Sequence, residues 1–141
     1  MAKYIKPTLN TKFHIDFSWW QQSTHNLSAD LRTHACEQAR EEWERRDPDQ
    51  PYTFDWINPD TGEVFTIDVL WHYIMNHCAQ DPDFINDFTP LTTGIFRAFL
   101  ANNNTPLTAK EIHALLPKKS ANIILRTIGG RRTFKGIRPI V

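Results

Sequence analysis

The C-terminal third of the chain is the most constrained part of the sequence, because helix breakers divide it into short pieces. Apolar residues recur at helical spacing over Leu91–Ala101, and the run Asn102-Asn103-Asn104 then interrupts the pattern. Thr108 and Glu111 have the spacing of a capping box, which predicts that a second helix starts directly after Thr108. Pro117 ends this helix after about two turns. The segment therefore cannot form one long helix.

A third helix is predicted over Ala121–Ile128, where apolar residues again recur at helical spacing. The run Lys118-Lys119-Ser120 precedes it, and Gly129-Gly130 ends it. The residues Arg131–Ile137 are predicted to form a basic strand. Three short helices with a tight turn between the second and third, followed by a strand, have the order of a winged helix.

The stretch LTAKEIHALLPKKSANIILRTIGGRRTFKGIRPI resembles the winged helix-turn-helix superfamily. In that superfamily the third helix usually enters the DNA major groove, and the wing contacts the backbone or the minor groove. Gly136 and Pro139 interrupt the few residues after Gly130, so only a short wing is expected. The resemblance implies that the following residues bind nucleic acid: Lys118, Lys119, Ser120, Asn122, Arg126, Arg131, Arg132 and Lys135.

The formal net charge of zero conceals two oppositely charged parts. Residues 1–89 contain seven basic and 15 acidic residues, whereas residues 90–141 contain nine basic residues and one acidic residue. The parts therefore carry net charges of −8 and +8. A basic part of this kind indicates an anionic partner, of which a phosphate backbone is the commonest. The alternative is that the two parts neutralise each other, within one molecule or between neighbouring molecules.

The first 89 residues mix strand and helix patterns. Alternation predicts a strand over Lys12–Ser18, and an apolar stripe predicts a helix over Ser28–Arg46. A hairpin is expected over Tyr52–Asp68, followed by a helix to Gln80. The sequence thus predicts an α+β protein. An acidic unit of strand, hairpin and helices (1–89) would precede a basic winged-helix-like module (90–141).

Two cysteines, Cys36 and Cys78, lie on predicted helices. Because neither a secretory signal nor a membrane span is recognisable, we expect a cytoplasmic protein whose thiols are reduced and buried. A metal site made by His34, Cys36, His77 and Cys78 would require the two helices to meet there. The spacings do not match those of zinc sites, so neither a metal nor another cofactor is expected, although the sequence does not decide whether the four residues meet.

Catalytic signals are weak. His14 and Asp16 share a face of the first predicted strand, but no phosphate loop or nucleophile motif accompanies them, so we expect no enzyme. The main hypothesis is a small DNA-binding protein, similar to a transcription regulator, that places residues 118–128 and a short basic strand on double-stranded DNA. The alternative is an adaptor whose C-terminal module binds protein. Ile123 does not belong to the core face of the third predicted helix, and it would then contact the protein partner. In the main hypothesis the acidic unit mediates sensing or assembly, through a protein partner or a second copy of the chain. In the alternative it supplies the surface on which the C-terminal module docks.

Overall fold

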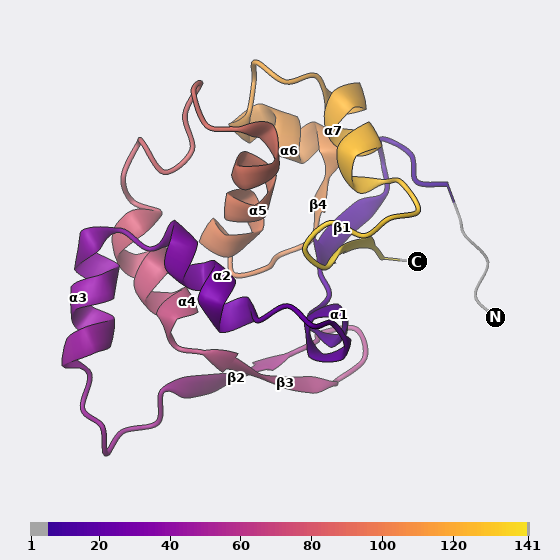
Figure 1. Cartoon of the computed structure of the whole chain (residues 1–141). Helices are drawn as coiled ribbons and strands as arrows, with labels where there is room; N and C mark the ends of the chain where they lie inside the picture. Colours follow the sequence, from indigo (N-terminus) through magenta and orange to yellow (C-terminus); the bar gives the residue numbers. More distant parts are fainter. Residues whose placement is uncertain (1–5, 141) are drawn as a thin grey trace. The chain divides into compact units, whose positions relative to one another are not determined.

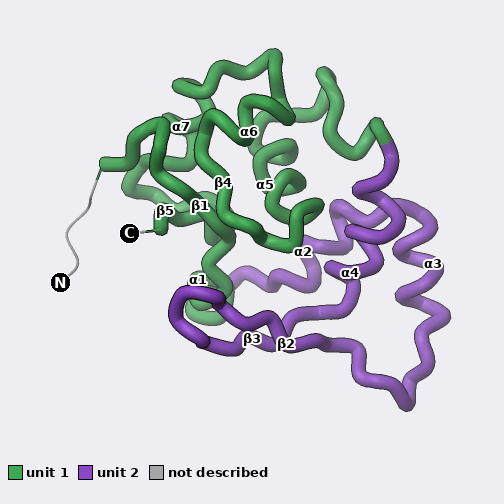
Figure 2. Tube along the Cα trace, turned by 180° about the vertical axis from the view of Figure 1, so that it is seen from behind, with its two compact units in different colours: residues 1–23, 82–141 green, residues 24–81 purple. Residues whose placement is uncertain are grey.

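The computed structural model describes residues 6–140 and confirms the α+β class, with short antiparallel sheets among helices. The chain forms two compact units, coloured separately in Figure 2. Unit 1 combines the described residues up to Ser23 with those from Pro82 onward. Unit 2 is the continuous segment Thr24–Asp81. The division thus differs from the expected one at residues 89 and 90, since the N-terminal strand belongs with the C-terminal helices.

Strand β1 (Lys12–Ile15) explains this division, because it is the central strand of the sheet in unit 1. It pairs antiparallel with β4 (Leu107–Thr108) on one side and with β5 (Ile137–Pro139) on the other. Phe13 and Ile15 are fully buried on one face of it. The alternating pattern thus predicted a strand correctly, but it could not identify partners so distant in sequence.

The predicted strand ends earlier than expected, because Asp16 starts a helix. Its Oδ1 atom accepts a hydrogen bond of 2.9 Å from the backbone N–H of Ser18, which caps α1 (Phe17–Gln22). The Ser18 hydroxyl donates to the same oxygen at 2.6 Å. The expected strand residues after Asp16 are therefore helical.

Three helices complete unit 1, at the positions that the breakers and periodicity predict. They are α5 (Leu91–Ala101), α6 (Ala109–Leu115) and α7 (Ala121–Ile128), which pack against one another (Figure 1). Phe96, Phe99, Ile112 and Ile124 are among the fully buried side chains between them. Close packing of these apolar faces is the main source of stability for helices this short.

Asn104 connects the helical part of unit 1 to its central strand. Its Oδ1 atom accepts a hydrogen bond of 2.8 Å from the Ile15 backbone N–H, and its Nδ2 atom donates to the Ile15 carbonyl at 2.9 Å. The side chain is 2% exposed. Because the pairing of β4 with β1 ends at Phe13, the Asn104 amide supplies the hydrogen bonds that a longer β4 would make.

We predict that Asn104→Asp destabilises the protein by about 2–3 kcal/mol, because the Ile15 carbonyl loses its donor and a charge is buried. The free energy of unfolding from urea denaturation measures this. Asn103→Asp is the matched control, since Asn103 is an exposed neighbour that shares the left-handed backbone conformation. Equal effects of the two substitutions would contradict the role assigned to Asn104.

Unit 2 contains two helices, a hairpin and a third helical segment. The elements are α2 (Leu27–His34), α3 (Glu37–Arg45), β2 (Thr53–Ile57), β3 (Val64–Asp68), α4 (Leu70–Tyr73) and the π-helical turn η1 (Ile74–Cys78). The expected hairpin is present. The single helix expected from Ser28 to Arg46 is instead two helices, with a break at Ala35 and Cys36. Asn26 rather than Ser28 caps the first of them.

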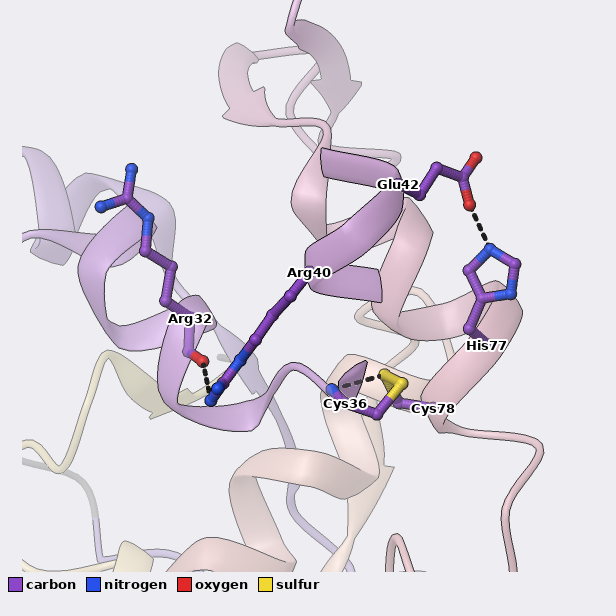
Figure 3. The surroundings of a disulfide bond; sticks show 6 residues. All are labelled: Arg32, Cys36, Arg40, Glu42, His77 and Cys78. Carbon is purple, nitrogen blue, oxygen red and sulfur yellow. Dashed lines mark hydrogen bonds and ion pairs between the residues drawn. A yellow bond between two sulfur atoms is a disulfide. The ribbon is translucent and has the colours of Figure 1, made fainter. Parts of the chain in front are cut away.

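Cys36 and Cys78 form a disulfide bond with a Cα–Cα distance of 5.5 Å (Figure 3). The expectation of reduced thiols is therefore wrong for this structure. The break between α2 and α3 places Cys36 beside the end of η1, and its backbone N–H also donates to Cys78 Sγ at 3.0 Å. The metal site weighed from the sequence is also excluded, because the two sulfurs are bonded to each other. Of its two histidines, His77 contacts Glu42, as the figure shows, and His34 lies 3.5 Å from Asp30.

We predict that reduction of the disulfide lowers the free energy of unfolding of unit 2 by about 4 kcal/mol, because the bond joins residues 42 positions apart and restricts the unfolded chain. Denaturation with and without reductant, followed by tryptophan fluorescence, measures the change. A Cys36→Ser/Cys78→Ser variant is the control and should not respond to reductant. Identical curves for the wild-type chain would count against a stabilising disulfide.

Candidate nucleic-acid interface

The charge split predicted from the sequence survives the new division of the chain. The sequence of unit 1 contains twelve basic and four acidic residues, and that of unit 2 contains four basic and twelve acidic residues. The net charges are again +8 and −8. The basic unit now includes Lys6 and Lys12 from the N-terminal segment, which the sequence analysis assigned to the acidic part.

The predicted capping box at the start of α6 is confirmed. Thr108 Oγ1 accepts a hydrogen bond of 3.2 Å from the Glu111 N–H, and Glu111 Oε1 accepts one of 3.0 Å from the Thr108 N–H. The hydrogen bond from the Thr108 backbone lowers the pKa of Glu111 below its ordinary value. The carboxylate is therefore used to fix the start of α6.

A tight turn joins α6 to α7. The backbone N–H of Lys119 donates to the Leu116 carbonyl at 2.9 Å, and His113 Nδ1 contacts the Lys119 carbonyl at 2.5 Å. Ser120 Oγ accepts a hydrogen bond of 3.1 Å from the Ile123 N–H, so Ser120 is the N-cap of α7. Of the predicted site residues, Ser120 thus has a structural role in deciding where α7 begins.

Helix α7 has one buried and one exposed face. Ile124 and Ile128 are buried, whereas Asn122, Ile123 and Arg126 are exposed. Asn122 and Arg126 are four residues apart, which places them on the same side of the helix. The exposed face thus combines an amide and a guanidinium with the apolar side chain of Ile123, which is 45% exposed.

The two lysines in the turn have different surroundings. Lys118 Nζ lies 3.6 Å from Asp87 Oδ2, and both side chains are more than half exposed. Such exposed ion pairs contribute little free energy, so an incoming anion can replace the Asp87 carboxylate. Lys119 is half-buried.

The expected basic strand Arg131–Ile137 is wrong, because β5 begins only at Ile137. Lys135 and Gly136 have φ values of 47° and 79°, which bend the chain sharply before β5. Trp20 Nε1 donates to the Lys135 carbonyl at 3.1 Å, and the Asp16 N–H donates to the Gly136 carbonyl at 2.7 Å. These two hydrogen bonds from the N-terminal segment stabilise a bend where the sequence predicted a wing strand.

The bend separates the basic residues that the sequence assigned to one strand. Arg131 and Arg132 are exposed. Lys135 is half-buried, and its ammonium group lies 5.4 Å from the centre of the Phe96 ring, a cation–π distance. The candidate surface therefore consists of the exposed face of α7, the two lysines of the turn before it, and the two arginines that follow the helix.

Arg138 lies on β5, and its Nη1 atom is 3.2 Å from Asp16 Oδ2. Burial opposes ionisation of Asp16, but hydrogen bonds from Ser18 and Arg138 outweigh it, so the pKa of this carboxyl lies below its ordinary value. The ion pair of the Asp16 carboxylate with the Arg138 guanidinium therefore joins the start of α1 to β5.

We predict that Gly136→Ala destabilises the protein by about 2 kcal/mol, because an L-residue is strained at positive φ. The added Cβ would also lie 2.8 Å from Trp20 Nε1. Gly130→Ala is the matched control, since nothing lies within 4 Å of a Cβ there. Urea denaturation of both variants measures the difference. If both lose the same free energy, the bend does not depend on glycine at 136.

One exposed aromatic side chain was not identified from the sequence. Phe88 is 92% exposed on the loop before α5. No periodic pattern includes Phe88, so no local signal could have indicated that it points into solvent.

Unit 2 has clefts on its surface. A cleft of about 420 Å³ is lined by Arg32, Arg40, Trp43 and Leu70, together with Thr33 and Glu44. Within residues 6–140, no three His, Cys, Asp or Glu side chains are grouped to hold a metal ion. No helix in the same range has the length and apolar character needed to cross a membrane.

Comparison of the chain with protein-family models, curated proteins and solved structures found no match.

Proposed function

We propose that unit 1 binds double-stranded DNA through the exposed face of α7, and that the protein acts as a regulator-type binding protein rather than an enzyme. The observation that carries the proposal is the pair Asn122 and Arg126, exposed one turn apart on a capped helix in a unit of net charge +8. Asparagine can pair with adenine and arginine with guanine at base edges in the major groove.

The backbone contacts would come from the residues on either side of α7. Lys118 and Lys119 precede the helix, and Arg131 and Arg132 follow it. The order α5–β4–α6–α7–β5 supports the resemblance to the winged helix-turn-helix superfamily. The bend at Lys135 leaves a shorter wing than that superfamily has, and β1 takes the central place in the sheet. We therefore assign the main contact to α7.

Salt dependence tests the proposal. If about four phosphates are contacted, the affinity for mixed-sequence duplex DNA should fall about 100-fold between 50 and 200 mM salt. Fluorescence anisotropy of a labelled duplex, titrated with the full chain, measures it. Absence of binding at the lower salt concentration would overturn the proposal.

Charge reversal tests the surface. Arg126→Glu should weaken duplex binding at least tenfold, because a cation facing the DNA becomes an anion. Lys110→Glu is the matched control. It changes the net charge of unit 1 by the same amount as Arg126→Glu. Lys110 is not on α7, however, and its Nζ atom lies 3.4 Å from Asn10 Oδ1 in the N-terminal segment. Equal losses for the two variants would mean that net charge alone, and not the α7 face, determines binding.

Protein docking remains a second candidate function, because two large apolar side chains are exposed beside the turn. Leu115 at the end of α6 is 48% exposed, and Ile123 on α7 is 45% exposed. The charges of the two units would favour contact between unit 1 and the acidic unit of a second copy. Sedimentation of the wild type and of an Ile123→Asp variant measures self-association. If protein docking is the function, the wild type self-associates and the substitution abolishes the association.

We also propose a cytoplasmic location, the compartment that the sequence predicts. The Cys36–Cys78 disulfide is of a kind more common in oxidising compartments. Alkylation of thiols during cell lysis, followed by mass spectrometry, therefore tests location and redox state together.

A further inference from the structure

Phe88 is the most exposed large apolar side chain of the described residues, at 92%. A phenyl ring in water buries none of its apolar area, so it contributes nothing to folding by that route. The question is whether the ring belongs to a mobile tip or is held in a defined place.

Hydrogen bonds from both sides of Phe88 hold its backbone. The Phe88 N–H donates to Asn86 Oδ1 at 2.9 Å, and the Thr89 hydroxyl donates to the same oxygen at 3.2 Å. The Asn86 N–H in turn donates to Thr89 Oγ1 at 2.9 Å. Thr89 is buried, so this network is fixed to the body of unit 1.

The beginning of the same loop is also anchored. Phe84 is 7% exposed, and its carbonyl accepts a hydrogen bond of 2.8 Å from Arg97 Nη1 on α5. The Arg97 guanidinium lies 4.8 Å from the centre of the Phe84 ring. One phenylalanine of the loop is therefore buried as an anchor, and the other is presented outward on a restrained backbone.

The neighbour of Phe88 connects the ring to the candidate interface. Asp87 contacts Lys118, which lies just before the N-cap of α7. Phe88 therefore directly follows a residue whose carboxylate lies 3.6 Å from a lysine that would contact a phosphate. A flat aromatic face beside a cation is the arrangement by which proteins hold single nucleotides, the ring stacking on the base and the cation binding its phosphate.

We propose that Phe88 stacks on an unpaired base, so that the preferred partner is a duplex carrying a bulged or frayed nucleotide beside the segment that α7 contacts. This inference rests on the proposed function, because it needs α7 to hold the flanking duplex. Stacking is tolerant of base identity, so the ring recognises the unpaired state rather than the sequence.

The test uses the full chain and three labelled DNA probes of the same sequence: a paired duplex, the duplex with one unpaired 2-aminopurine, and the single strand. We expect the bulged duplex to bind about tenfold more tightly than the paired one. The 2-aminopurine fluorescence should fall on binding, because stacking quenches it.

Three substitutions separate stacking from a general apolar contact. Phe88→Ala should abolish the preference for the bulged probe and the quenching, while affinity for the paired duplex stays within about twofold. Phe88→Trp should retain both effects, and Phe88→Leu should lose them. Because the ring is exposed, none of these changes removes buried area, and the variants should fold.

The possible failures are distinguishable. Binding of all probes without a preference, or a preference that survives in Phe88→Ala, would overturn the stacking role and leave the proposed function intact. If Phe88→Leu retained both the preference for the bulged probe and the quenching, stacking would also be overturned. Self-association that Phe88→Ala abolishes would assign the ring to a protein contact instead. Absence of binding to every probe at low salt would overturn the proposed function together with this inference.

Discussion

The insertion of β1 between β4 and β5 is the interaction on which the rest of unit 1 depends. Each flanking strand is only a few residues long and could not form a stable sheet without the central one. The Asn104 amide extends the pairing where β4 ends, and Phe13 and Ile15 carry the apolar face of the strand into the core. The N-terminal segment also shapes the bend at Gly136 through Trp20.

Elements set by local signals could be predicted from the sequence. The capping box, the breakers and the apolar spacing place α5, α6 and α7, because each signal acts within a few residues of chain. The hairpin of unit 2 follows from its turn residues in the same way. The unit division and the Cys36–Cys78 bond could not be predicted, since both join residues far apart in the sequence. The break between α2 and α3 could not be predicted either, because no Gly or Pro stands at it.

The candidate site shows the same limit at the level of side chains. Asn122 and Arg126 are exposed together because helical spacing alone decides which residues share a face. Lys135 is different, because its backbone conformation and its contact with Phe96 depend on tertiary packing. Phe88 has no periodic neighbours at all. Its exposure follows from the hydrogen bonds of Asn86 and Thr89, which sequence spacing does not reveal.

The place of β1 in the sheet also orders events during synthesis. Residues 12–15 leave the ribosome before residues 24–81, whereas their partner strand at 137–139 is made only after nearly all the other described residues. Unit 2 is continuous in sequence, so all its residues are available while the sheet of unit 1 is still incomplete. The apolar face of β1 must therefore wait, unpaired, through the synthesis of the whole inserted unit. A chain interrupted before residue 137 would lack one of the two strands that flank β1.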